Sequence, residues 1–322
     1  MMNWKKKYWL NFSIILLLIV LISGCSTSKD ASTEEQANQS DKLVIGVAHA
    51  NYEDTFLNMV LDGVKEFVDE HSNEMKADYI DAGNDSNKQI DQAEQFIEQG
   101  VDAIMLIPVD VIAAELILEK AERADIPIVL INRSSLETES VFIGSDDVSF
   151  GVMQMERIAQ MLKGKGNIAI MNGPMGQESQ INRTKGNKQV MEEHKGMKVV
   201  LEGTANWSQD EAKSLMKTWI ESGIKIDAVV ANNDEMAIGA IKAAEEAGIR
   251  DEIIFAGIDG TPDGLQYIKS NKLAVSVLQN AKEQGQTGMS TALRMAKGET
   301  VPKESIYIPA ELIVKENVDK FR

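Results

Sequence analysis

The sequence is poor in the residues on which much enzyme chemistry depends. Its 322 residues include one cysteine, Cys25, and three histidines, His49, His71 and His194. A single cysteine excludes an intrachain disulfide, so the core has to stabilise the fold without covalent links. The scattered histidines form no nucleophile–base pattern, and the first apolar run ends in GVAHAN (46–51), which lacks a dinucleotide-binding G-x-G-x-x-G. We therefore expect no enzyme activity and no cofactor.

The N-terminus has the pattern of a signal peptide, predicted at residues 1–24. Three consecutive lysines precede an almost unbroken run of Ile, Leu and Val at 12–22, which is short for a membrane span. The run ends in LISGC (21–25), which resembles the bacterial lipobox, whose cysteine is lipid-modified and becomes the new N-terminus. An ordinary cleaved signal or an uncleaved anchor is the alternative. Residues 25–41 contain no large apolar side chain, so we expect a lipidated flexible linker.

Positive charge is scarce. The formal net charge is −17, and removal of the three signal-peptide lysines lowers it to −20. An acidic surface of this kind repels nucleic acid, so we expect no nucleic-acid partner.

From residue 42 onward, short apolar runs alternate with amphipathic segments. The expected strands share mostly continuous apolar stretches and lie at 43–47, 77–80, 103–107, 128–131, 167–171, 199–201, 228–231 and 253–257. The expected helices lie between them, at 55–72, 87–99, 111–124, 180–193, 208–221 and 235–247. Gly100 and Gly223 follow helices where a left-handed cap is needed. Two such runs predict an α/β protein with two doubly wound, Rossmann-like lobes, which bind ligands at the carboxyl ends of their strands.

Several segments, in order along residues 42–315, resemble the bacterial sugar-binding proteins of the ribose/galactose type, which share their fold with the ligand domains of LacI-type repressors. The matching segments are YEDTF (52–56), NDSNKQ (84–89), INR (131–133), IGSD (143–146), ANNDEMA (231–237) and GIDG (257–260). Together with TANW (204–207), the ANNDEMA segment looks closest to glucose/galactose binders.

The resemblance implies a type I periplasmic binding protein whose lobes are joined by three hinge crossings, near 145–149, 278–281 and 306–309. The N-terminal lobe would comprise residues 42–145 and about 281–305. The C-terminal lobe would comprise about 146–280 and 306–322. A sugar would lie between the lobes, and their closure would create a surface for a membrane partner.

A sugar presents hydroxyl groups that need polar partners and C–H faces that pack on aromatic rings. The positions that the resemblance identifies are of these types: Asp54, Phe56, Asn132, Arg133, Arg183, Trp207, Asn233, Asp259 and Gln279.

In the first half, each of these residues also has an ordinary structural interpretation. Asp54 is placed to cap a helix, and Phe56 to join the core. Asn132 is suited to a turn, and Arg133 to an interlobe or surface salt bridge. His49 follows the first strand, where we expect a satisfied surface or loop histidine, with a place in the cleft as the alternative.

The second half offers similar alternatives. Arg183 fits a helix surface, Asn233 a helix cap, Asp259 a turn before Gly260, and Gln279 the cap of a crossing. Trp207 lies in a polar loop, where a sugar-facing role is favoured. In contrast, Trp219 lies in a helix pattern and is expected in the core.

Two features depart from the glucose/galactose pattern. The stretch that matches the family's calcium loop is MLKGKGN (161–167), which lacks oxygen ligands, so no metal site is expected. Ser179 stands where the family has an aspartate four residues before the arginine, which leaves the sugar undefined.

The sequence therefore predicts a monomeric, lipid-anchored substrate-binding protein of an ABC sugar importer at the outer face of the cell membrane. Its ligand would be a monosaccharide, either a hexose such as glucose or galactose, or ribose or inositol. A receptor that presents a sugar or inositol to a membrane sensor kinase is the alternative. A LacI-type regulator is excluded by the signal peptide and by the acidic charge.

Overall fold

The computed structural model describes residues 42–135 and 140–321. The predicted signal peptide, Cys25 and the linker lie outside these ranges. Within them, none of the helices combines the length and the apolar character needed to cross a membrane.

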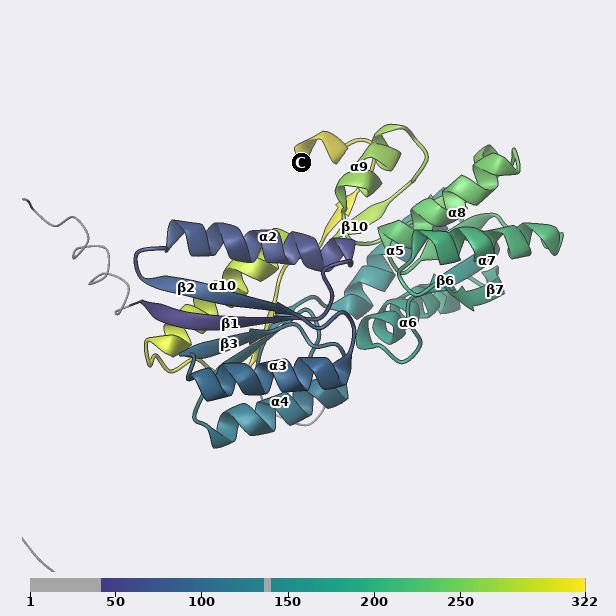
Figure 1. Ribbon diagram of the computed structural model, residues 1–322. Helices are drawn as coiled ribbons and strands as arrows, with labels where there is room; N and C mark the ends of the chain where they lie inside the picture. The colour runs from purple at the N-terminus through teal and green to yellow at the C-terminus, as the bar shows by residue number, and fades with distance from the viewer. Residues whose placement is uncertain (1–41, 136–139, 322) are drawn as a thin grey trace, which may run out of the picture. The chain divides into compact units, whose positions relative to one another are not determined.

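The first sheet is parallel and six-stranded. Its strands, in spatial order, are β11 (Ser305–Tyr307), β5 (Val141–Gly144), β4 (Ile128–Ile131), β3 (Ala103–Leu106), β1 (Leu43–His49) and β2 (Met75–Asp81). Helices α2 (Thr55–Glu70) and α10 (Ala281–Ala296) pack together on one face, and α3 (Ser86–Gln99) and α4 (Val111–Arg123) on the other (Figure 1). Because helices cover both faces, β3 and β4 are apolar and buried throughout.

The second sheet is parallel and four-stranded, in the order β7 (Gly196–Thr204), β6 (Lys165–Asn172), β8 (Ala228–Ala231) and β9 (Ile254–Ala256). Helices α5 (Asp147–Met161) and α6 (Glu178–Glu193) share one core with it, and α7 (Gln209–Glu221) and α8 (Asp234–Glu246) share another. The short helices η1 (Arg250–Glu252) and α9 (Pro262–Lys269) flank β9. Trp219 on α7 is 5% exposed, which confirms its predicted place in the core.

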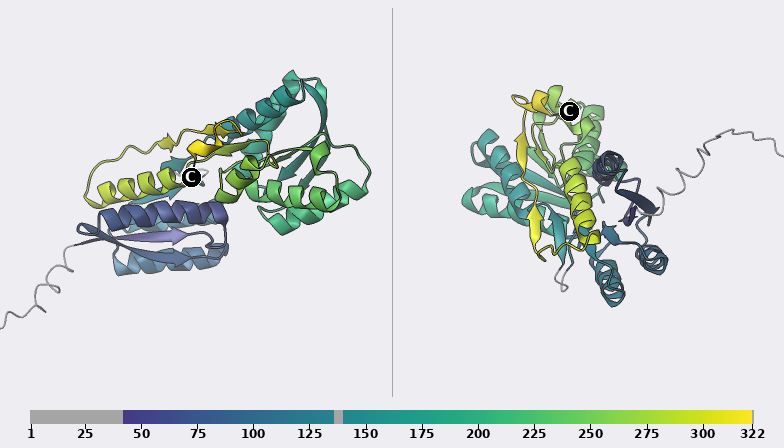
Figure 2. Two further views of the ribbon diagram at one scale, coloured as in Figure 1. Left: turned by 90° about the horizontal axis from the view of Figure 1, so that it is seen from above. Right: turned by 90° about the vertical axis from the view of Figure 1, so that its left-hand side faces the viewer.

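The chain passes between the two groups of elements three times, after β5, after β10 (Ser276–Leu278) and after β11. Strand β10 pairs antiparallel with β12 (Glu311–Ile313), which is followed by η2 (Val318–Lys320). Figure 2 follows the yellow C-terminal segment from α10 through β11 to β12. This topology confirms the predicted fold class. The lobe limits remain a prediction, and β11 extends two residues into the range assigned above to the C-terminal lobe.

Helix ends follow local rules that the sequence already indicates. Gly100 ends α3 with a φ of 68°, and Gly223 follows α7 with the same angle, as predicted for left-handed caps. At the other end, Asp54 caps α2 and Asn233 caps α8 by accepting a main-chain N–H three residues on. Both caps stand at carboxyl ends of strands, so the loops that carry them are held where a ligand site is expected.

Candidate functional site

One cavity of about 330 Å³ is lined by all nine side chains that the sequence identifies as ligand contacts, together with Leu57 and Ser179. The nine residues follow seven different strands of both large sheets and of the small one. Their convergence reflects geometry, because parallel strands bring their carboxyl ends to the same edge of a sheet. Ser179 also faces the cavity, so the position where the family has an aspartate is a lining position here.

On the side of the first sheet, residues that have the expected structural roles also line the cavity. Asp54 Oδ1 accepts a hydrogen bond from Leu57 N at 3.0 Å, and Asp54 also lines the cavity. Phe56 is 6% exposed and belongs to the core, yet it lies on the cavity wall. A cap and a core contact therefore fix the two side chains in place before any ligand arrives.

His49 corrects a prediction. It was expected on the surface or in a loop, but β1 continues through it and it is fully buried. Its Nδ1 accepts from Asn51 N at 3.1 Å, which leaves Nε2 to donate to Leu57 O at 3.1 Å. Burial lowers the pKa of His49 below its usual 6.5, so the neutral ring that these bonds require is favoured. Through its bonds to Asn51 and Leu57, His49 holds the two ends of the segment that carries Asp54.

Asn132 and Arg133 directly follow β4. The guanidinium of Arg133 donates through Nη1 to Pro108 O at 2.8 Å and Val109 O at 3.0 Å. No ion pair between described residues includes Arg133, so the alternative of an interlobe or surface salt bridge is not seen there. Burial lowers the pKa of Arg133, and the negative field of Asp54 opposes this. Arg133 thus brings a positive charge to the cavity that is held by main-chain oxygens.

Arg183 lies at the centre of a buried ion-pair cluster. Its Nε donates to Asp147 Oδ1 at 2.7 Å, Nη1 donates to Asn232 O at 2.7 Å, and Nη1 is 3.6 Å from Asp259 Oδ1. Helix α6 approaches α5 closely enough to allow this, because a Cβ on Gly151 would stand 2.0 Å from Arg183 O. The alternative of a surface arginine is therefore wrong, since the side chain is 5% exposed.

Trp207 packs against the loop that follows β6. Its ring packs on Gly173, where an added Cβ would lie 2.1 Å from the indole, and Nε1 donates to Gln177 Oε1 at 2.9 Å. Its φ of 64° is unusual for a bulky residue. The ring also faces the guanidinium of Arg183, with 5.7 Å between Cζ and the ring centroid. These contacts present the indole to the cavity.

Asp259 is 2% exposed and has a φ of 132°. Its Oδ1 accepts from Gln279 Nε2, and burial raises the pKa of this carboxyl well above its usual range, against the opposing effect of Arg183.

The bond between Gln279 and Asp259 is the last of a chain of side-chain hydrogen bonds, a relay that spans the crossings between the two sheets. Asn132 Nδ2 donates to Gln284 Oε1 at 3.4 Å, and Gln284 Nε2 to Ser145 Oγ at 3.1 Å. Ser145 Oγ then donates to Gln279 Oε1 at 3.4 Å. All donations point toward Asp259, so each bond polarises the next, and two cavity residues from opposite sheets are joined.

Three supporting residues escaped sequence analysis: Asp147, Gln177 and Gln284. None lines the cavity, and each holds a residue that does. Asp147 directly follows the IGSD segment, and its place in the first crossing is the only signal that pointed to it.

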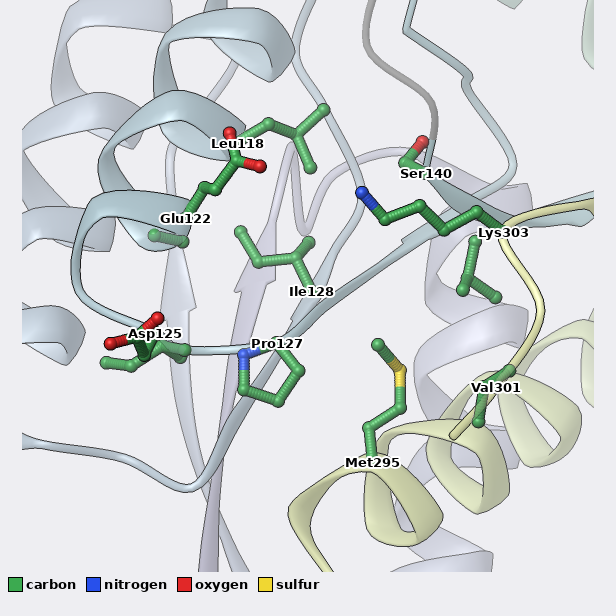
Figure 3. Close-up of a pocket in the computed structure, with 12 residues that line it drawn as sticks. Leu118, Glu122, Asp125, Pro127, Ile128, Ser140, Met295, Val301 and Lys303 are labelled. Carbon is green, nitrogen blue, oxygen red and sulfur yellow. The ribbon is translucent and has the colours of Figure 1, made fainter. Parts of the chain in front are cut away.

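The described residues contain no cluster of three or more His, Cys, Asp or Glu side chains suited to a metal ion. A second, larger cavity of about 1050 Å³ lies at the amino ends of β4 and β5. Figure 3 shows that apolar side chains such as Leu118, Ile128 and Met295 surround it, with charged groups at its margin. It lacks the convergent polar groups of the first cavity, so we assign the candidate site to the first.

Comparison with known proteins gives consistent matches over most of the chain. The family model described as "Periplasmic binding protein domain" matches residues 45–300. A xylitol-binding protein of Mycolicibacterium smegmatis is 40% identical over 289 residues, which cover 88% of this chain and 81% of the relative. The ribose import binding protein of Bacillus subtilis is 29% identical over 302 residues, 93% of this chain and 96% of the relative.

Among solved structures, an ABC transporter solute binding protein from Bacillus halodurans with bound myo-inositol is 46% identical, with a TM-score of 0.84. The match covers 87% of this chain and 97% of that one. Sequence and structure agree over nearly all of the folded part, and the chain belongs to the periplasmic binding protein domain family.

Proposed function

We propose that the protein is the substrate-binding component of an ABC importer and that it binds one neutral, monosaccharide-sized polyol, with myo-inositol as the leading candidate. The observation that carries this proposal is a polar cavity lined by residues that follow strands of both large sheets. The expected size of the ligand follows from the related structure from Bacillus halodurans, which contains myo-inositol.

The charges around the cavity favour an uncharged ligand. Two carboxyl groups, Asp54 and Asp259, face two guanidinium groups, Arg133 and Arg183, so the lining carries no net formal charge. The amides of Asn132, Asn233 and Gln279 add groups that donate and accept. A ring of hydroxyls matches this mixture, because each hydroxyl does both. Phe56 and Trp207 supply apolar surfaces for the C–H faces of the ring.

The choice of inositol over glucose or galactose rests on two supports. Ser179 supplies no carboxylate where the glucose/galactose pattern has one. The related structure from Bacillus halodurans contains myo-inositol, and the related protein from Mycolicibacterium smegmatis is named for xylitol. Glucose and galactose have no such support, although a related solute binding protein from Actinobacillus succinogenes, 25% identical, contains the hexose D-allose.

A thermal-shift screen of the mature protein tests the ligand. A ligand that binds only the folded state raises Tm, by an amount that grows with its concentration above Kd. We expect myo-inositol to give the largest shift, xylitol and ribose smaller ones, and glucose and galactose little. Glucuronate is the control for charge and should give no shift. A larger shift with galactose than with myo-inositol would contradict the ligand assignment.

We propose further that Cys25 carries the lipid anchor and holds the protein at the outer face of the cell membrane. The LISGC sequence supports this. Cys25→Ser should release the protein from the membrane fraction of expressing cells, whereas Ser26→Ala should leave it there. The import role and the alternative role with a sensor kinase differ in the protein's partner, so crosslinking of the ligand-bound protein in its own membrane should recover an ABC permease. Recovery of a sensor kinase would favour the alternative.

A further inference from the structure

The third residue of the Asn-Asn-Asp segment, Asp234, does not line the cavity, although it lies next to Asn233, which does. Its side chain is fully buried at the start of α8. A buried carboxyl group outside the ligand site needs an explanation, because desolvation opposes its charged form.

The partners of Asp234 all belong to the segments around Asp259. Oδ2 accepts from Thr261 N at 2.9 Å, and Oδ1 accepts from Ser276 Oγ at 2.7 Å. Ser276 Oγ accepts in turn from Gly260 N at 3.1 Å, and the main-chain N–H of Asp234 donates to Ile258 O at 2.7 Å. One residue therefore holds the loop 258–261 at both ends and fastens it to β10.

Two glycines make room for this carboxyl group. A Cβ on Gly257 would lie 2.2 Å from Asp234 Oδ1, and a Cβ on Gly264 would lie 2.3 Å from Oδ2. The loop is thus packed directly against the carboxylate from the strand before it and from the helix after it. Between these two contacts, Asp259 adopts its φ of 132°, a region that a residue with a side chain rarely occupies unless its surroundings impose it.

We propose that Asp234 is a positioning residue for the ligand cavity: it clamps the loop 258–261 against β10 and thereby holds the Asp259 carboxyl group toward the ligand. This role rests on the proposed function, because that function supplies the ligand that Asp259 would contact. The electrostatics agree with the geometry, because the nearby charge of Asp234 contributes to the raised pKa of Asp259.

A double-mutant cycle tests the proposal, with the dissociation constant for myo-inositol measured by calorimetry. Asp234→Asn keeps the size of the side chain but leaves one acceptor oxygen in place of two, so the side chain can no longer accept from both Thr261 N and Ser276 Oγ. We expect about tenfold weaker binding for this variant, within the range of coupling between contacting residues. In the background of Asp259→Asn, the same change should alter affinity by no more than about twofold, because the residue through which Asp234 acts is already lost.

The matched control is Asp227→Asn. Asp227 lies at the amino end of β8, the end away from Asn233, and also accepts a main-chain N–H, from Asn167 at 2.7 Å. Its loss should leave affinity unchanged. If Asp234→Asn fails to fold, Ser276→Ala replaces it in the cycle, because it removes the hydroxyl that joins Asp234 to Gly260. Unchanged affinity, or equal losses in both backgrounds, would refute the positioning role.

A crystal structure of the unliganded variant separates this inference from the proposed function. We expect the loop 258–261 to relax and the φ of Asp259 to leave the positive region. If the wild type does not bind myo-inositol, the ligand assignment fails and this structure alone decides the role of Asp234. An unchanged loop in the variant would overturn the inference even where the ligand binds.

Discussion

Two residues of the cavity wall that follow strands of the second sheet are braced by side chains, whereas two that follow strands of the first sheet bond to main-chain atoms. Arg183 is held by Asp147, and Trp207 by Gln177. In contrast, Asp54 bonds to a main-chain N–H, and Arg133 to two main-chain carbonyls. Either kind of partner is left unpaired when its mate is replaced, but a buried carboxylate without its cation costs more than a carbonyl without its donor. The same kind of substitution should therefore have different effects in the two pairs of residues.

The largest difference is expected between Arg183→Met and Arg133→Met. Loss of Arg183 leaves Asp147 and Asp259 buried without their cation, which should lower the free energy of unfolding by about 3–5 kcal/mol. Loss of Arg133 leaves no carboxylate without a hydrogen-bonded cation, so the free energy of unfolding should decrease by about 1 kcal/mol. Urea unfolding followed by circular dichroism measures both. Equal decreases would show that the two pairs of residues do not differ in this way.

A smaller effect is expected on binding when an aromatic wall is removed. Trp207→Leu should weaken myo-inositol binding by about 0.5–1.5 kcal/mol, because the ring no longer covers a face of the ligand. Titration of tryptophan fluorescence provides the readout. The wild-type signal should change on binding and the variant signal should not, since Trp219 lies in the core of α7 and serves as the internal reference. A signal change that persists in Trp207→Leu would place the ligand elsewhere.

A third effect concerns the dependence of stability on pH. Burial raises the pKa of Asp234 to about 7, above the ordinary 3.8 of an aspartate. A raised carboxyl pKa contributes stability that is complete below about pH 4 and is lost as the pH rises to about 7. The free energy of unfolding of the wild type should therefore fall, relative to Asp234→Asn, between these pH values. Carboxylates with a lowered pKa, such as Asp227, act in the opposite direction, so the informative quantity is the difference between the two curves. Parallel curves would contradict the assignment.

The sequence predicts the fold well because its signals are local. Continuous apolar runs such as IVLI at β4 indicate buried parallel strands, and Gly100 marks the end of a helix. The convergence of the nine residues follows from the same logic, since each stands just beyond a strand end or in the helix that follows one. His49 shows the limit. It is buried because β1 continues two residues beyond the predicted strand, to position 49. The polar residue types at that end of the strand did not indicate this extension.

The residues that sequence analysis missed act over long separations. Gln284 contacts Asn132 across 152 positions, and Gln177 contacts Trp207 across 30. A glutamine in a helix or loop carries no local mark of such a bond. Asp234 was inside a recognised segment, yet only the contacts with Thr261 and Ser276 distinguish its place from that of Asn233.

The relay from Asn132 to Asp259 gives the molecule a mechanical property. Ser145 lies on the first crossing and Gln279 directly follows β10 on the second, so rotation of one sheet about the crossings would strain the bonds between them. Asn132 and Asp259, the two ends of this linkage, both face the cavity. A ligand bound to both Asn132 and Asp259 would therefore hold the relay in place. The crossings would then bend less easily in the ligand-bound protein than in the free protein.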